Sequence, residues 1–231
     1  MGESPNGPIT EVVAIDGPAG AGKSTVARRV ADALGYAFLD TGATYRAATW
    51  LAMQRGIDWD DLPALEAMVA SMDLELDANQ HPTRVTVNGE DVTEAIRTRE
   101  LTQNIHRIAD RPELRTHLVE LQRSIARKQP TVAEGRDMGT VVFPEARAKI
   151  YLDASVDERA RRRSEELSAK GQQADLDAIR AEIADRDARD RARPVGALKQ
   201  ADDATRVDTT GKTIDEVVDE IVETTRKKWG Q

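Results

Sequence analysis

The sequence predicts an α/β fold built on a parallel sheet, and two observations support that prediction. Apolar runs typical of buried strands alternate along the chain with helix-length segments in which apolar residues recur every three or four positions. The first apolar run, 12–15, leads directly into a glycine-rich loop and then into a helix. Strands separated by helices pair in parallel through right-handed crossovers, so these segments are expected to form one sheet flanked by helices.

The first expected elements surround the glycine-rich loop. Apolar residues at helical spacing follow the loop and predict a helix that ends at Gly35, a residue suited to a left-handed helix cap. A short second strand is expected at 36–40. Residues 40–46 then turn into another helix, which is expected to end near 55–56.

The next part of the chain interrupts this alternation. Two segments with alternating apolar residues, 74–76 and 84–87, are expected to be strands. Asn88 and Gly89 follow them and form the strongest hairpin signal in the chain, because both residue types accept a positive φ angle. A hairpin among strand–helix units predicts a small antiparallel insertion at about 68–105.

After the insertion the chain returns to helices and parallel strands. Helices are expected at about 101–108, 112–125, 157–193 and 214–228, and strands at 130–134, 148–153 and 204–208. The third of these helical segments is highly charged, and Pro194 is expected to end it.

Length and composition limit the class of protein. The 231 residues allow one domain over 10–231, with 1–9 expected as a loose tail. There are no cysteines, which excludes disulfides and thiolate metal sites. No apolar run approaches a signal peptide or a membrane span, so we expect a cytoplasmic protein that does not act at a membrane. A net charge of -8 disfavours nucleic acid as a partner and requires local arginines to hold any anionic ligand.

The glycine-rich loop matches the pattern G-x-x-x-x-G-K-[ST]. The residues expected to hold a nucleotide are Gly17, Pro18, Ala19, Gly20, Ala21, Gly22, Lys23, Ser24 and Thr25. Glycines let successive backbone N–H groups close around a polyphosphate at the positive end of the following helix. Lys23 is expected to reach the outer phosphates, and the Ser24 hydroxyl is expected to bind Mg²⁺.

A phosphate loop alone leaves GTPases, ATPase motors and small-molecule kinases open. The guanine-reading pattern N-K-x-D and the transporter signature L-S-G-G-Q are both absent from the sequence, and the D-x-x-G at 208–211 lies near the C-terminus, after the last strand. Arginines follow two other strands, as Arg46 and Arg136, and cluster at 186–193. Ligands bind at the carboxyl ends of parallel strands, so these arginines favour a second anionic ligand, as a kinase requires.

Four motifs give the chain a resemblance to the bacterial cytidylate kinases over nearly its full length after residue 9. They are I-D-G-P-A-G-A-G-K at 15–23, D-T-G-A-T-Y-R at 40–46, G-R-D-M-G-T-V-V-F-P at 135–144 and R-D-A-R-D-R-A-R at 186–193. The resemblance implies the fold of P-loop nucleoside monophosphate kinases, with a five-stranded parallel sheet. It also implies a core at about 10–67 and 106–231, a monophosphate-binding insertion at about 68–105 and a short helical lid at about 157–193.

The resemblance further implies a reaction and a site. The reaction is transfer of the γ-phosphoryl group of ATP, with Mg²⁺, to CMP or dCMP in pyrimidine nucleotide metabolism, by a monomer. The residues implied for catalysis are Lys23, Arg136, Arg186 and Arg193. The residues implied for the acceptor are Arg46 and Arg136 at its phosphate, Asp137 and Arg115 at the cytosine, Arg186 and Asp190 at the ribose, and Thr41 in the same site.

The chemistry of these residue types supports the implied roles. The planar forks of Arg46 and Arg136 suit a monophosphate, although either alone could form a surface salt bridge. Arg186, Asp190 and Arg193 would share one helical face, which a solvated charged helix would also explain. An ionised Asp137 only accepts hydrogen bonds and suits the amine of cytosine.

Two questions stay open at the level of sequence. Many family members have a small serine where this chain has His106, which could donate to the cytosine carbonyl or simply pack beside the base. The alternatives to a CMP kinase are a kinase for another small acceptor, such as UMP or shikimate, and a non-catalytic ATP-binding switch. A switch has no use for a second pocket around Arg46, Arg136 and Asp137.

Overall fold

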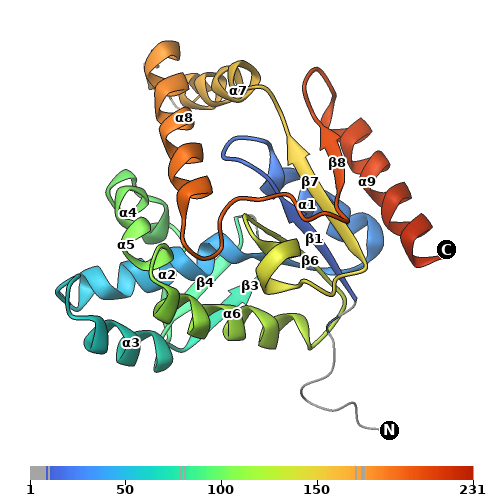
Figure 1. The fold of residues 1–231 in the computed structure, drawn as a ribbon. Coiled ribbons are helices and arrows are strands. Elements are labelled where there is room, and N and C mark those ends of the chain that lie inside the picture. Colours follow the sequence, from blue (N-terminus) through green and yellow to red (C-terminus); the bar gives the residue numbers. More distant parts are fainter. Residues whose placement is uncertain are drawn as a thin grey trace, which may run out of the picture.

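A parallel sheet of five strands forms the centre of the molecule (Figure 1), which confirms the predicted fold class. The computed structural model describes residue 9 and residues 11–78, 80, 82–169, 171–172 and 175–230. The strands are β1 (Val12–Asp16), β2 (Ala37–Asp40), β6 (Thr131–Gly135), β7 (Ala148–Asp153) and β8 (Thr205–Asp208). Their order is β2-β6-β1-β7-β8, so the strand that precedes the phosphate loop lies in the middle. Apart from residue 9, the tail expected at 1–9 lies outside the described residues.

Side chains of β1 alternate between two apolar layers. Val13 and Ile15 pack against α1 (Lys23–Leu34) and α9 (Ile214–Trp229) on one face of the sheet. Val12 and Ala14 face the other layer, which includes residues of α6 (Pro112–Ala126) and of the π-helical turn η2 (Met138–Val142). Both faces of the central strand are therefore covered, as its continuous apolar sequence predicts.

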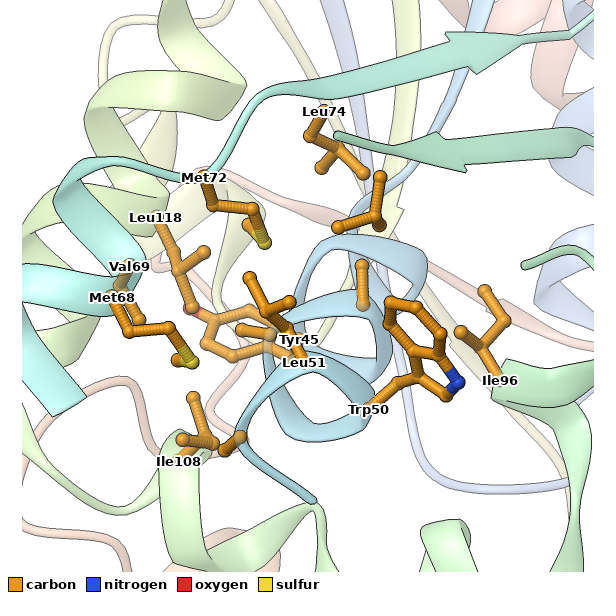
Figure 2. Packing of buried hydrophobic residues seen from close by; sticks show 14 of the residues in the cluster. Tyr45, Trp50, Leu51, Met68, Val69, Met72, Leu74, Ile96, Ile108 and Leu118 are labelled. Atoms are coloured by element: carbon orange, nitrogen blue, oxygen red, sulfur yellow. The ribbon is translucent and has the colours of Figure 1, made fainter. Parts of the chain in front are cut away.

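A third apolar cluster joins the antiparallel insertion to the core. The elements of this region are α2 (Thr41–Gln54), α3 (Leu62–Ala70), β3 (Leu74–Asp77), β4 (Arg84–Val87), β5 (Glu90–Asp91), η1 (Ala95–Arg97), α4 (Arg99–Asn104) and α5 (His106–Ala109). Figure 2 shows Tyr45, Trp50 and Leu51 of α2 packed among residues from these elements. Arg28 of α1 adds a polar link, because its guanidinium donates to the Ala78 carbonyl and to the Thr83 hydroxyl.

Two expected helices are each divided in the structure. The helix expected at 101–108 is interrupted at Ile105, where the Ile105 carbonyl accepts hydrogen bonds from the N–H groups of both Ile108 and Ala109. The charged segment expected at 157–193 forms two helices, α7 (Val156–Ala169) and α8 (Leu176–Ala192). Asp175 begins the second by accepting hydrogen bonds from the next turn. Among the described residues, no helix combines the length and apolarity that a bilayer crossing needs.

The hairpin predicted at Asn88 and Gly89 is confirmed. The two residues join β4 to β5 with φ angles of 50° and 82°. Two left-handed residues give the turn whose twist matches that of the flanking strands.

We expect Gly89→Ala to lower the free energy of unfolding by about 1 kcal/mol, because an alanine must adopt the left-handed conformation. No atom lies within 4 Å of the added Cβ, so the backbone conformation is the whole cost. Urea denaturation measures the difference, and Glu90→Ala, an exposed neighbour, is the control. A Gly89→Ala protein as stable as the parent chain would contradict this account of the turn.

Candidate functional site

A cavity of about 630 Å³ lies at the carboxyl edge of the parallel sheet. Its lining includes phosphate-loop residues 19–25, the ends of β2 and β6, and residues of both lid helices, α7 and α8. This volume is within the range of small-molecule sites. The sequence places polar residues at these strand ends, and the parallel register brings those ends to one edge.

The phosphate loop has the backbone that its sequence predicts. Gly20 and Gly22 have φ angles of 78° and 82°, and α1 begins directly afterwards at Lys23. Gly17 packs so tightly that an added Cβ would lie 2.1 Å from the Leu152 carbonyl oxygen. Gly17 and Pro18 themselves do not line the cavity, whereas the rest of the predicted loop does.

Lys23 is buried, and its ammonium group donates to the Pro18 carbonyl at 2.7 Å. Burial, together with the nearby charges of Arg136 and Arg186, lowers the Lys23 pKa to about 7, although Glu134 opposes the shift. The lysine therefore lies where an additional negative charge would favour its protonated form.

Glu134 is a site residue that the sequence analysis treated only as the end of a strand. It is 5% exposed, lines the cavity, and lies at the carboxyl end of β6. Burial and Asp40 raise its pKa, while Lys23 and a hydrogen bond with Ser24 lower it. An acidic residue at the carboxyl end of a central strand is the sequence signal that could have identified it.

The predicted acceptor arginines also line the cavity, and they are paired with carboxylates. Arg46 contacts Asp40 at 2.7 Å, and Arg136 contacts Asp190 at 2.8 Å. The second oxygen of Asp190 accepts Arg193 at 2.7 Å. Asp190 is only 4% exposed, which a freely solvated helix face would not produce. The structure thus brings Arg46, Arg136, Asp190 and Arg193 together around one cavity, with Arg186 also in its lining.

Asp137 forms a buried ion pair with Arg115, and both line the cavity. Burial raises the pKa of Asp137, although the Arg115 guanidinium opposes that shift. The Arg115 guanidinium also lies over the Tyr45 ring, 5.2 Å from its centre. Gly196 closes against this pair from the chain beyond the lid, since an added Cβ there would lie 2.6 Å from the Asp137 carboxylate.

Thr41 and His106 have different positions relative to the cavity. Thr41 lines it, and its hydroxyl donates to the Glu134 carbonyl at 2.6 Å. His106 is not among the lining residues; its Nδ1 lies 2.8 Å from the Gln103 carbonyl oxygen. Ile105 and Ala109, on either side of it in sequence, line the cavity instead.

The lid helices contact the phosphate loop through a second buried ion pair, which the sequence analysis did not identify. Arg159 of α7 donates to the carbonyl of Ala19 at 2.9 Å and to Asp187 of α8 at 2.7 Å. The N–H of Ala19 in turn donates to Asp187 at 3.3 Å. Ala19 therefore contacts both lid helices.

Comparisons with known proteins find related sequences over nearly the whole chain. The model of a family described as cytidylate kinase matches residues 13–227. The chain is 47% identical over 211 residues to a cytidylate kinase of Exiguobacterium sibiricum, covering 91% of this chain and 95% of that protein. It is 46% identical over 218 residues to a cytidylate kinase of a Geobacillus strain, covering 94% and 97%. It is also 49% identical over 218 residues to a bifunctional pantoate ligase/cytidylate kinase of a Synechococcus strain, covering 93% of this chain and 40% of that protein.

Among solved structures, the crystal structure of an uncharacterized protein from Eubacterium ventriosum is similar with a TM-score of 0.51. The two chains are 11% identical, and the match covers 94% of this chain and 98% of the other. At this identity the similarity concerns the fold alone.

We expect the protein to take up a proton when it binds metal-free ATP at about pH 8. Lys23, with a pKa of about 7, is then mostly neutral, and the phosphates raise its pKa and favour the charged form. Calorimetry in buffers of different ionisation enthalpy measures the uptake. Lys23→Met should abolish it, and the control Lys227→Met, on the exposed side of α9, should retain it. Binding without uptake in the parent chain would contradict the depressed pKa.

Proposed function

The chain belongs to the cytidylate kinase family, and we propose that it transfers the γ-phosphoryl group of ATP to CMP and dCMP, giving CDP and dCDP. One observation supports this more than any other: a single cavity is lined both by the phosphate loop and by the arginines Arg46, Arg136 and Arg193. Phosphoryl transfer needs little more from a protein than positioning and positive charge around the transferred group.

On the donor side, the backbone N–H groups of residues 19–25 and the ammonium of Lys23 would bind the phosphates of ATP. The Ser24 hydroxyl and the nearby Glu134 carboxylate are hard oxygen donors, which fit Mg²⁺. When bound, Mg²⁺ neutralises charge that builds up between the outer phosphates. The negative charge of those phosphates would keep Lys23 protonated. Its ammonium group would then bind the phosphates and stabilise the transferred phosphoryl group.

On the acceptor side, the phosphate of the monophosphate would take the place of the carboxylates that form ion pairs with the arginines in this structure. Arg46 is held by Asp40, and Arg136 by Asp190, so both guanidinium planes are oriented before the ligand arrives. Two such forks bind a phosphate in a defined orientation and direct its attacking oxygen at the γ-phosphorus. Transfer is then direct and in line, without a covalent intermediate on the protein. Arg186, Asp190 and Arg193 would hold the ribose and the transferred group as the lid covers them.

The runner-up functions differ in what they require of the acceptor half. A kinase for UMP or shikimate would use the same donor loop with a different partner for Asp137. A non-catalytic ATP-binding switch would need no acceptor half, and the paired arginines opposite the loop argue against it. We further propose a cytoplasmic monomer of pyrimidine nucleotide metabolism, whose net charge of -8 suits small-molecule partners and disfavours nucleic acid.

Two lid substitutions should separate binding from turnover. Asp190→Ala should mainly raise KM for the monophosphate, because it removes a ribose contact and releases Arg136, while Arg193 keeps its ion pair with Asp110. Arg193→Ala should mainly lower kcat, because this side chain meets charge that develops during transfer. Steady-state kinetics with CMP measures both. Arg180→Ala is the control, because Arg180 is a half-buried arginine of α8 that does not line the cavity; identical kinetics for all three variants would refute the assignment.

Base choice gives the sharpest test of the acceptor. The cytosine amine donates where the uracil carbonyl accepts, so an ionised Asp137 should favour CMP over UMP by at least about tenfold in kcat/KM. Asp137→Ala should lower activity on CMP far more than on UMP. ADP release in a coupled assay over a panel of monophosphates measures the ratios, with thermal unfolding to confirm that the variant is folded. Equal use of CMP and UMP by the parent chain would reject cytosine recognition at Asp137.

A further inference from the structure

Asp16 is a buried carboxylate at the end of the central strand, and no role has been assigned to it so far. It is the last residue of β1 and is 3% exposed. Its Oδ1 accepts a hydrogen bond from the Met138 N–H at 2.7 Å, and its Oδ2 accepts one from the Gly139 N–H at 2.8 Å. Both oxygens are thus used on adjacent amides of one turn, 122 and 123 residues away in sequence.

The two segments that Asp16 joins belong to opposite halves of the site. Asp16 immediately precedes Gly17 and the phosphate loop. The amides it binds begin the turn η2, directly after Arg136 and Asp137. The parallel pairing of β1 with β6 ends where Asp16 lies opposite Gly135, so the β-ladder does not extend to the two acceptor residues. The Asp16 carboxylate provides the next connection between the donor and acceptor halves.

We propose that Asp16 is a positioning residue, which fixes the turn carrying Arg136 and Asp137 at the distance from the phosphate loop that in-line transfer requires. The inference rests on the proposed kinase function. Displacement of a binding group by about 1 Å is enough to lower the rate of such a reaction by about a hundredfold, so a rigid connection at this point has a direct kinetic effect.

The charges around Asp16 come from each neighbouring element. Asp137 on the turn raises its pKa and Lys23 on α1 lowers it, while Tyr151 lies on the adjacent strand β7 and Lys149 of β7 packs beside Gly139. Burial is the largest influence and raises the Asp16 pKa to about 7 despite the two amide hydrogen bonds. The ionised form accepts most strongly with both oxygens, because protonation turns one of them into a hydroxyl, whose oxygen is a weaker acceptor. The turn is therefore held above about pH 7 and loosened below it.

The same shift means that ionisation of Asp16 opposes folding. A carboxylate whose pKa is higher in the folded than in the unfolded state contributes stability below its unfolded pKa and loses that contribution as the pH rises through about 7. Above that pH the ionised Asp16 is a net cost to folding. A residue that the fold tolerates at a cost is one for which a functional role is expected.

The first test is the substitution Asp16→Asn. The amide oxygen of the asparagine can accept a hydrogen bond from one of the two backbone N–H groups, but its NH₂ group would face the other N–H, so that two donors oppose each other. We expect kcat/KM for CMP to fall about tenfold, the effect of losing one charge-assisted hydrogen bond, and KM for ATP to change by less than about twofold. In the parent chain, we expect kcat/KM for CMP to fall between about pH 8 and pH 6 as Asp16 is protonated. The same fall should be smaller in the variant, which lacks the titrating carboxylate. Asp61→Asn is the matched control, because Asp61 also accepts a backbone N–H but lies outside the cavity.

A second measurement does not depend on the variant's folding. In the ¹⁵N-labelled parent chain, the amide resonances of Met138 and Gly139 should titrate together with a midpoint near pH 7. Amides that do not titrate, or a folded Asp16→Asn protein with the kinetics and pH profile of the parent chain, would overturn the inference. A parent chain that does not phosphorylate CMP would instead refute the proposed function, and the amide titration would still test the contact.

Discussion

The arrangement of the site follows from one electrostatic constraint: several cations must lie close together in a cavity that is partly closed to water. The effect of this crowding is visible at Lys23, whose pKa is lowered to about 7 by burial and by two arginines. Carboxylates make the arrangement stable, since Asp40 holds Arg46 and Asp190 holds both Arg136 and Arg193. Each of these acids comes from a different element than the phosphate loop. The positive charge of the cavity therefore depends on the fold that brings the acids to it.

The sequence was sufficient for the parts of the structure that depend on local signals. The glycine spacing at 17–22 predicted the loop, the Asn88–Gly89 pair predicted the hairpin, and apolar periodicity predicted the five strands and most helices. Motif positions also predicted some of the arginines that line the cavity, but not those of α7, which are Arg159, Arg161, Arg162 and Arg163. The breaks at Ile105 and before Asp175 were not predicted, because the apolar and charged patterns continue through them.

The contacts that sequence reasoning missed all join distant parts of the chain. Asp187 binds the N–H of Ala19, 168 residues away, and Asp16 binds amides 122 and 123 residues away. An aspartate in a charged helix or at the end of a strand has no local feature that identifies such a partner. His106 illustrates the opposite case, because a position aligned by motif lies outside the cavity lining, whereas its neighbours Ile105 and Ala109 line the cavity. Sequence motifs thus predict individual site residues better than they predict the contacts between distant segments.

The paired arginines have a consequence for how the protein responds to its solution environment. In the proposed reaction, a nucleotide that enters this cavity would exchange one set of ion pairs for another, because its phosphates would take the places of Asp40 and Asp190 on the arginines. Dissolved salt screens the old pairs and the new ones alike. Substrate affinity should therefore change less with ionic strength than in a pocket whose cations face only water. The acids that hold the arginines in place thus also protect catalysis from changes in the electrolyte content of the cell.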